Sequence, residues 1–316
     1  MGWEWGQLEL IRELADRGSV TAVAQATHRT PSAVSQQLKA LQRQAGIPLV
    51  EPAGRGLRLT DAGRALAASA GGVATALAEA DAAWDAFLGR TAGTVRLAAF
   101  FSAGELLIPG LVERLAAYPD LSLETYDEDV ATDDFAGLVR DYDIVIAHRP
   151  DDTEPPARSE VRVTPLLREP LDLAVPADHR LAGKAHIEPA DVVGERWIAP
   201  PPDFPIEQAV RALAARSGAP ARVVRRTTHL PLIEGLVARG QGIALLPRYS
   251  TQGHAAGGYV LLPIRGIRAG RHIEALSRPD RAARRAVQVV LDALRIEAER
   301  VTGSPITAVA GTPSGA

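Results

Sequence analysis

The chain has 316 residues, of which 46% are hydrophobic, so it can bury the cores of about two or three domains. The formal net charge is -3, so the overall charge indicates neither nucleic acid nor a membrane as a partner, and any such signal must be local. The absence of cysteine excludes disulfides, thiolate metal sites and a cysteine nucleophile, and it fits a reducing cytosol.

The N-terminal segment MGWEWGQLELIRELADRG predicts an amphipathic helix that contains acidic residues. It has neither the basic start nor the apolar centre of a secretory signal. The longest apolar runs, such as GIALLP, are far shorter than the ~20 residues that a membrane span needs. We therefore expect a cytoplasmic protein without a membrane partner.

Residues 19–46, SVTAVAQATHRTPSAVSQQLKALQRQAG, contain no acidic side chain, although the whole chain is slightly acidic. Thr30 is the predicted N-cap of the second of two short helices, and Pro31 takes its first position, where a missing N–H costs nothing. The apolar stripe of this second helix consists of Val34, Leu38 and Leu41. Two short helices joined by the tight turn THRT are typical of a helix-turn-helix.

The charge of this region favours DNA as its partner. Residues 20–64 carry six basic and two acidic side chains, which gives a local charge of +4. A carboxylate on a helix in the major groove is repelled by phosphates, whereas Ser, Gln, Lys and Arg reach base edges or phosphates. The alternative is an ordinary solvated helix face, which usually mixes Glu with Lys. The candidate DNA-binding residues of the helix are Thr30, Pro31, Ser32, Ser35, Gln36 and Lys39.

The next segment, IPLVEPAGRGLRLTDAG, places an arginine between two glycines and then a strand-like run. A β-hairpin with Arg at its tip, directly after a reading helix, is typical of a wing that contacts the minor groove or phosphates. We predict DNA contacts for Arg55 and Arg58. The alternative is a hairpin with a purely structural role.

Residues 61–90 predict one long helix. Apolar or small residues recur in steps of 4 and 3 from Leu66 to Phe87, which is the spacing of a heptad seam. About 28 helical residues would span roughly 42 Å, and so long a seam favours a partner helix over packing on its own domain alone. The candidate dimerisation residues are Leu66, Val73, Leu77, Trp84 and Phe87.

From Thr94 onward, strand-like runs such as TVRLAAF and DIVIAH alternate with helical patterns such as GELLIPGLVERLAAY. This alternation predicts βαβ units and a parallel sheet. A second set follows from PLDLAVP to YVLLPI, and a last strand, HIEALS, precedes a helix at 281–300. The end of the chain is rich in Gly, Pro, Ser and Thr, which predicts a disordered tail.

The motif GSVTAVAQATHRTPSAVSQQLKALQRQAGIPLV, followed by GRGLRLTDAGRAL, resembles the N-terminal winged helix-turn-helix of LysR-type transcriptional regulators. The combination of PSAVSQQLKAL with RLTDAG about twenty residues further on is quite specific to this family. The resemblance covers residues 1–64, and a weaker one extends across the whole chain. The family usually has Phe near Leu10 and near Val50, and Glu where this chain has Gln42. The resemblance implies that the long helix pairs two subunits, in a homodimer or a homotetramer that binds double-stranded DNA.

The resemblance also implies the fold class. It is a multi-domain α+β protein with an N-terminal winged helix-turn-helix, a long linker helix and a C-terminal effector-binding region of two α/β subdomains, like a periplasmic binding protein. The expected domains are the winged helix-turn-helix at 1–60, the linker and dimerisation helix at 61–90, the effector-binding domain at 91–302 (subdomains 94–165 with 268–300, and 166–267) and the tail at 303–316.

A small-molecule effector is expected in the cleft between these subdomains, beyond the carboxyl ends of strands. The helix start after VRLAAF offers free N–H groups, and Ser102 adds a hydroxyl at a position where the family commonly has an effector-contacting Ser or Thr. The alternative for Ser102 is simple N-capping, and Glu105 in the first turn disfavours an anionic ligand. The candidate effector-binding residues are Phe101, Ser102, Ala103, His148, Asp203, Phe204 and His229.

No phosphate-binding, dinucleotide, hydrolase or zinc motif occurs, and the acidic run DEDVATDD lacks the spacing of a calcium loop. We therefore expect no cofactor, no metal site and no enzymatic activity. The predicted function is a sequence-specific, DNA-binding transcriptional regulator controlled by a small effector. The alternatives are a solute-binding or sensor protein, and an α/β enzyme with a regulatory N-terminal module.

Overall fold

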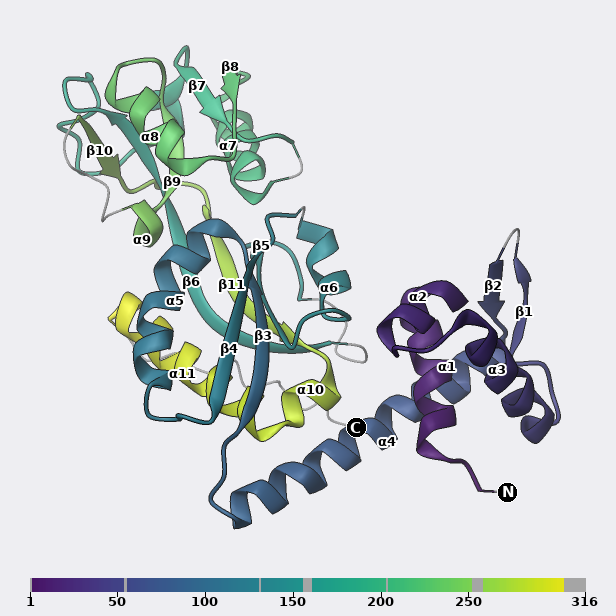
Figure 1. The fold of residues 1–316 in the computed structure, drawn as a ribbon. Coiled ribbons are helices and arrows are strands. Elements are labelled where there is room, and N and C mark those ends of the chain that lie inside the picture. Colours follow the sequence, from purple (N-terminus) through teal and green to yellow (C-terminus); the bar gives the residue numbers. More distant parts are fainter. Residues whose placement is uncertain are drawn as a thin grey trace, which may run out of the picture. The chain divides into compact units, whose positions relative to one another are not determined.

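The N-terminal head of the protein consists of helices and one β-hairpin, as the computed structural model shows (Figure 1). The structure describes residues 2–53, 56–130, 132–155, 161–202, 204–251 and 258–303. The elements of the head are α1 (Trp5–Arg17), α2 (Val20–Ala26), α3 (Pro31–Ala45), β1 (Val50–Ala53) and β2 (Gly56–Leu59).

The turn between α2 and α3 is fixed by short-range hydrogen bonds. The Thr30 side chain caps α3 by accepting from the Ala33 N–H at 3.2 Å, as the sequence predicts. His28 has φ 53, in the left-handed region, and this bend lets the Arg29 N–H donate to the Ala24 carbonyl at 2.8 Å. The predicted apolar stripe of α3 is confirmed, since it is buried in the core of the head.

A single helix, α4 (Asp61–Phe87), follows the hairpin and continues through Gly71 and Gly72 without a break. Thr60 caps it by accepting from the Gly63 N–H at 3.1 Å. Its buried face is lined by small residues, and α1 and α10 (Pro279–Ala283) pack against the helix. The small residues on this face are Gly63, Ala67, Ala70, Ala74 and Ala82.

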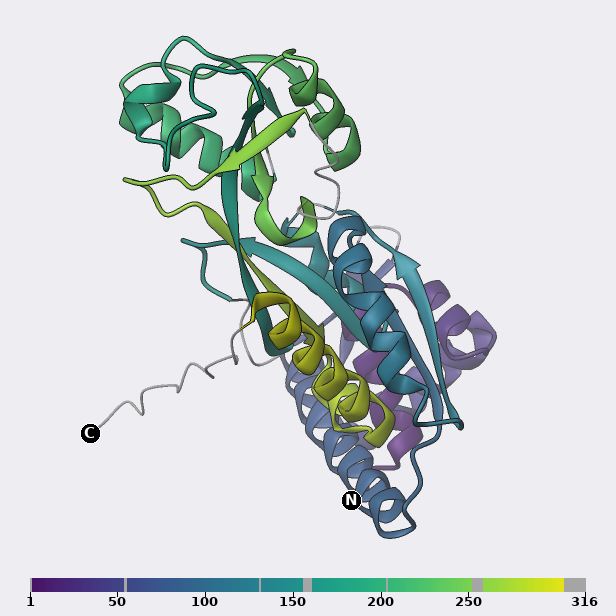
Figure 2. The ribbon, with the colours of Figure 1, turned by 90° about the vertical axis from the view of Figure 1, so that its left-hand side faces the viewer.

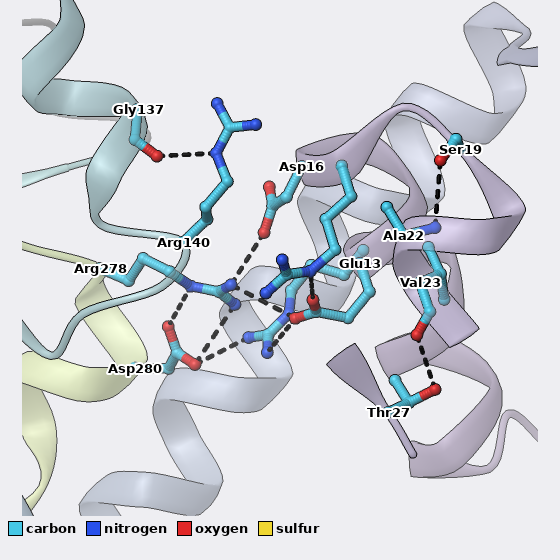
Figure 3. Close-up of polar contacts among 12 residues, drawn as sticks. Glu13, Asp16, Ser19, Ala22, Val23, Thr27, Gly137, Arg140, Arg278 and Asp280 are labelled. Atoms are coloured by element: carbon cyan, nitrogen blue, oxygen red, sulfur yellow. Dashed lines mark hydrogen bonds and ion pairs between the residues drawn. The ribbon is translucent and has the colours of Figure 1, made fainter. Parts of the chain in front are cut away.

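Residues Met1–Thr91 and Arg278–Gln288 form one compact unit, in which a buried ion-pair network joins α1 to α10 (Figure 3). Arg278 contacts Asp16 at 2.8 Å, Asp280 at 3.2 Å and Glu13 at 3.4 Å. Burial alone would lower the pKa of Arg278, but these three carboxylates outweigh it and raise the pKa. The network fixes α1 to the chain segment that directly follows the last strand.

The second compact unit, Ala92–Ser277 with Val289–Ala316, contains two lobes joined by one long strand. The first lobe contains β3 (Gly93–Ala99), β4 (Leu121–Asp127), β5 (Ile144–Pro150), β11 (Gly270–Ser277), α5 (Phe101–Leu115), a 3₁₀ turn (Thr132–Asp134), α6 (Phe135–Leu138) and most of α11 (Arg285–Thr302). The second lobe contains a 3₁₀ turn (Pro189–Val192), β7 (Arg196–Ala199), β8 (Arg222–Arg226), β9 (Ala244–Pro247), β10 (Tyr259–Leu262), α7 (Pro205–Ser217), α8 (Leu230–Ala238) and α9 (Arg248–Thr251). β6 (Arg162–Pro176) passes through both lobes, as Figures 1 and 2 show.

The main sheet has the strand order β10-β6-β11-β5-β3-β4, and β9 also pairs with β6. β3 is parallel to β4 and to β5, whereas β11 is antiparallel to both β5 and β6. The prediction of a parallel sheet is therefore only partly right. Because β6 and β11 return through the first lobe in opposite directions, they add antiparallel pairs that local patterns did not reveal.

The predicted fold class is confirmed: a winged helix-turn-helix head, a long helix and a two-lobed α/β region follow one another along the chain. The boundary that we expected between the two subdomains, at residues 165 and 166, lies within the continuous strand β6. The described residues contain no helix that is long and apolar enough to cross a membrane.

Replacement of Gly63 by Ala is expected to destabilise the head by about 3 kcal/mol. A Cβ at this position of α4 would overlap the backbone carbonyl oxygen of Leu49, which cannot move as a flexible side chain can. Gly6→Ala is the matched control, because a Cβ there meets open space, and it is expected to be neutral or to stabilise by less than about 1 kcal/mol. Urea unfolding of both variants measures this, and equal stability of the two would contradict the packing described.

Candidate functional site

A cavity of about 240 Å³ lies between the two lobes of the second unit. Its first-lobe wall includes Phe100, Phe101, Ser102, Glu105, Asp129, His148 and Arg271. Its second-lobe wall includes Phe204, Ile206, Thr228, His229, Leu230 and Ile233. The cavity thus combines apolar and aromatic walls with polar groups, of which the charged ones all lie on the first lobe, and such a mixture is usual for a small-molecule site.

A buried ion pair forms the polar end of the cavity. Arg271 on β11 lies directly opposite Glu169 on β6 in the antiparallel register. The guanidinium Nε and Nη2 donate to Glu169 Oε2 at 3.0 and 2.7 Å. Glu169 is 0% exposed and Arg271 5%, so neither charge would be tolerated there without the other.

Ser102 and Ser250 complete this network from two further elements. Arg271 Nη2 donates to the Ser102 hydroxyl at 2.9 Å, which ties α5 to the pair. The Ser250 N–H and hydroxyl both donate to Glu169 Oε1, at 2.7 and 2.9 Å, which ties α9 to it as well. The guanidinium also lies 5.0 Å from the Phe100 ring centroid, within range of a cation–π interaction. The charge of Arg271 is therefore already balanced within the protein.

His148 stands beside this network as a neutral side chain. Its ring lies 4.7 Å from that of Phe100 and 5.0 Å from that of Phe135, edge to face in both cases. Burial, and secondarily the charge of Arg271, lower the pKa of His148 to about 3, although its own backbone carbonyl opposes the shift. Its buried Nδ1 has no hydrogen-bond partner among the described residues.

Two carboxylates, Glu105 and Asp129, line the same cavity and are solvent-exposed. Neither forms a salt bridge with a residue in the described ranges. Desolvation raises the pKa of Asp129, while the charge of Arg271 acts in the opposite direction. The expectation that Glu105 lies in the first turn of its helix is wrong, because α5 begins at Phe101 and places Glu105 in the second turn.

The structure brings together Phe101, Ser102, His148, Phe204 and His229, all of which line the cavity. Ala103 is fully buried within α5 and is absent from the cavity lining in the described part of the chain, and Asp203 lies outside the described residues. Ser102 does not cap α5, because its hydroxyl accepts from Arg271 instead.

Sequence reasoning missed Arg271, Glu169 and Asp129. Asp129 was noted only as part of an acidic run that reads as a solvated loop. Glu169 was the easiest of the three to find, because it lies in the strand-like run PLLREPLDLAV, and an acid inside a buried strand needs a partner. Nothing near Arg271 in the sequence marks it as that partner.

The outer face of α3 is the second candidate site. Thr30, Pro31, Ser32, Gln36 and Lys39 are exposed there, and Ser35 is half-buried. Gln36 and Lys39 border a shallow hollow next to Pro48. In the hairpin, Arg58 forms an exposed ion pair with Glu51 at 2.7 Å, and Arg55 lies outside the described residues.

The segment between α3 and the hairpin is held by Gln42, whose Oε1 accepts from the N–H groups of Leu49 and Val50 at 3.0 and 3.1 Å. A glutamate, which the resembled family usually has here, would accept the same two bonds. The departure at this position therefore keeps the contact that positions the hairpin beside α3.

On α4, large apolar side chains are exposed beside the face of small residues. Trp84 is 59% and Phe87 79% exposed, and their rings stack at 5.4 Å. Val73 and Leu77 are exposed on the same seam, whereas Leu66 is half-buried against the core of the head. Within the described part of the chain, nothing covers this row of apolar side chains.

The chain matches two families in series. Residues 5–64 match the bacterial regulatory helix-turn-helix proteins of the lysR family, and residues 88–299 match the LysR substrate binding domain. The second match alone covers more than half of the chain. The protein therefore belongs to the LysR family.

Relatives and solved structures agree with this assignment. The chain is 28% identical over 283 residues to the transcriptional regulator CbbR of Rhodospirillum rubrum, covering 84% of this chain and 91% of CbbR. Full-length OxyR from Pseudomonas aeruginosa has the same fold, with a TM-score of 0.64 at 22% identity over 93% of this chain and 98% of that one. CbnR, solved in complex with its target DNA, has a TM-score of 0.52 at 19% identity over 94% and 100%.

The protein is thus a LysR-type, DNA-binding transcriptional regulator with an effector-binding domain. The winged helix-turn-helix of the head and the two-lobed region around the cavity are the structural counterparts of the two matched families.

Glu169→Leu is expected to lower the free energy of unfolding of the second unit by about 3–5 kcal/mol, because it leaves Arg271 buried without a counter-charge. The double variant with Arg271→Met removes both charges and is expected to be clearly more stable than Glu169→Leu alone. Urea denaturation of the wild type, both single variants and the double variant gives the coupling. Additive losses would show that the two side chains do not stabilise one another.

Proposed function

We propose that this LysR-type regulator binds DNA through the outer face of α3 and the hairpin, and that a small effector in the cavity between the lobes controls this binding. The observation that carries the proposal is the exposed surface of α3. That helix contains no acidic residue, and apart from Pro31 its exposed side chains are hydroxyl, amide and basic groups.

The proposed DNA contacts divide by chemistry. Gln36 is suited to base edges, because its amide can donate and accept towards adenine, while Ser32 and Ser35 reach either bases or phosphates. Lys39, Arg58 and Arg55 supply charge to phosphates or to the minor groove. The Thr30 hydroxyl lies 3.0 Å from that of Ser32, so Thr30 both caps α3 and contributes to its polar end. Pro31 starts the helix there.

The cavity is the proposed effector site because it combines an apolar lining with a preformed polar network. Phe101 and Phe204 supply aromatic surface, and Ser102, His148 and His229 supply polar groups. Since the walls come from both lobes, a ligand that contacts both changes the equilibrium between their arrangements by its difference in affinity for them.

The exposed seam of α4 is the proposed surface for self-association, in a homodimer or homotetramer. Val73, Leu77, Trp84 and Phe87 offer a continuous apolar row. Gly71 and Gly72 support the proposal, because a Cβ at either position would meet no atom of the described residues within 4 Å, so packing among these residues does not account for the two glycines. Leu66 sits at the head end of this seam.

We further propose that the protein acts without catalysis and in the cytoplasm. Its relatives carry the names of transcriptional regulators, and DNA binding requires access to the chromosome. Chemical conversion of a bound ligand by the purified protein, detected by mass spectrometry of the ligand after incubation, would contradict the absence of catalysis.

Gln36→Ala is expected to weaken binding to the preferred DNA sequence by about 1–3 kcal/mol and to relax the sequence preference, because base-edge bonds are lost. Lys39→Ala is expected to weaken binding to all sequences and to reduce the salt slope by about 1. Lys184→Ala is the matched control, since it removes the only other lysine, from the second lobe. Gel shifts at several salt concentrations separate these effects, and unchanged affinity in both head variants would refute the proposed face.

Leu77→Glu is expected to dissociate the oligomer, because a carboxylate in an apolar helix seam stays unpaired on association. The mass measured by light scattering should fall towards the 33.4 kDa of one chain. Ala76→Glu adds the same charge one position along, on a different side of the exposed helix, and should keep the larger mass. A Leu77→Glu protein that elutes with the mass of the wild type would exclude this seam as the interface.

A further inference from the structure

The charges around the cavity do not favour an anion. Arg271 is the only arginine or lysine among its described lining residues, and its charge is balanced by Glu169 at 2.7 Å. Glu105 and Asp129 line the cavity as well, and no salt bridge to a residue in the described ranges offsets either of them. With Arg271 balanced by Glu169 behind the cavity wall, the two lining carboxylates leave a net attraction for a cation.

The walls suit the body of such a cation. Phe100, Phe101 and Phe204 present aromatic surface, which attracts an ammonium group through the negative faces of the rings. Ile206, Leu230 and Ile233 supply aliphatic surface on the second lobe. At about 240 Å³ the cavity lies below the usual range for drug-sized ligands, so it fits a molecule of about one substituted ring.

His148 supplies an independent sign that a polar group is missing. It is 5% exposed, it lines the cavity, and its Nδ1 lacks a hydrogen-bond partner among the described residues. A buried polar atom without a partner is costly, so a ligand that bonds to it gains more than one that bonds to a solvated group. Since the imidazole is neutral, it does not repel a cation.

From these observations we infer that the effector is a small organic amine, protonated on an apolar or aromatic body, whose ammonium group lies towards Asp129 and Glu105. This inference rests on the proposed role of the cavity as the effector site, and it adds the chemical class of the ligand. The start of α5 does not compete for an anion through Ser102, because the Ser102 hydroxyl is bound to Arg271.

The test uses three probes of equal ring and chain length on the full-length protein: 2-phenylethylamine, 2-phenylethanol and phenylacetate. Isothermal titration calorimetry is expected to give the amine the lowest Kd, about tenfold or more below that of phenylacetate. Asp129→Asn should raise the Kd of the amine by about tenfold and lower that of phenylacetate, because one attracting charge is removed. Glu105→Gln should act in the same direction. Asp120→Asn, an exposed acid outside the cavity lining, is the control and should change neither value.

Tighter binding of phenylacetate, binding of none of the three probes, or an amine Kd unaffected by both carboxylate variants would overturn the inference. Gel shifts with each probe separate it from the proposed function. An amine that binds the cavity but leaves DNA affinity unchanged would support the ligand class and refute the effector role. If phenylacetate binds and changes the DNA affinity, the result would support the effector role of the cavity and refute the amine as the ligand class.

Discussion

The buried pair of Arg271 and Glu169 is the interaction on which the effector-binding domain depends. Two opposite charges on neighbouring strands are stable in the interior only while each satisfies the other. The pair then recruits Ser102 from α5 and Ser250 from α9, so that elements of both lobes converge on one point. These charged and hydroxyl groups add directional hydrogen bonds to the apolar packing at this end of the cavity.

The same pair determines what the cavity can bind. By neutralising Arg271 it removes the one strong positive charge of the lining and leaves the two exposed carboxylates to set the sign of the field. The positive charge of Arg271 also helps burial to lower the pKa of the neighbouring His148, which keeps this imidazole neutral. The cavity is therefore an apolar space with an acidic side and an uncharged imidazole, formed by a network that is complete before any ligand enters.

β11 relates this network to the DNA-binding head through the chain itself. The strand begins at Gly270, next to Arg271, and ends at Ser277, next to Arg278. Arg278 is buried among carboxylates of α1 and α10. A buried arginine therefore lies near the start of the strand, and another directly follows its end.

The sequence by itself determined the local features of the protein. The helix caps, the stripe of α3, its acid-free surface and the order of strands and helices follow from spacing of a few residues, where backbone bonding and periodicity decide. The tertiary structure alone decided which polar groups meet. Arg271 and Glu169 are 102 residues apart, and Arg271 and Ser102 are 169 apart. The mixed sheet and the burial that neutralises His148 were decided in the same way. The physical reason is that all of these features depend on how elements far apart in the sequence pack together, which patterns of a few residues do not reveal.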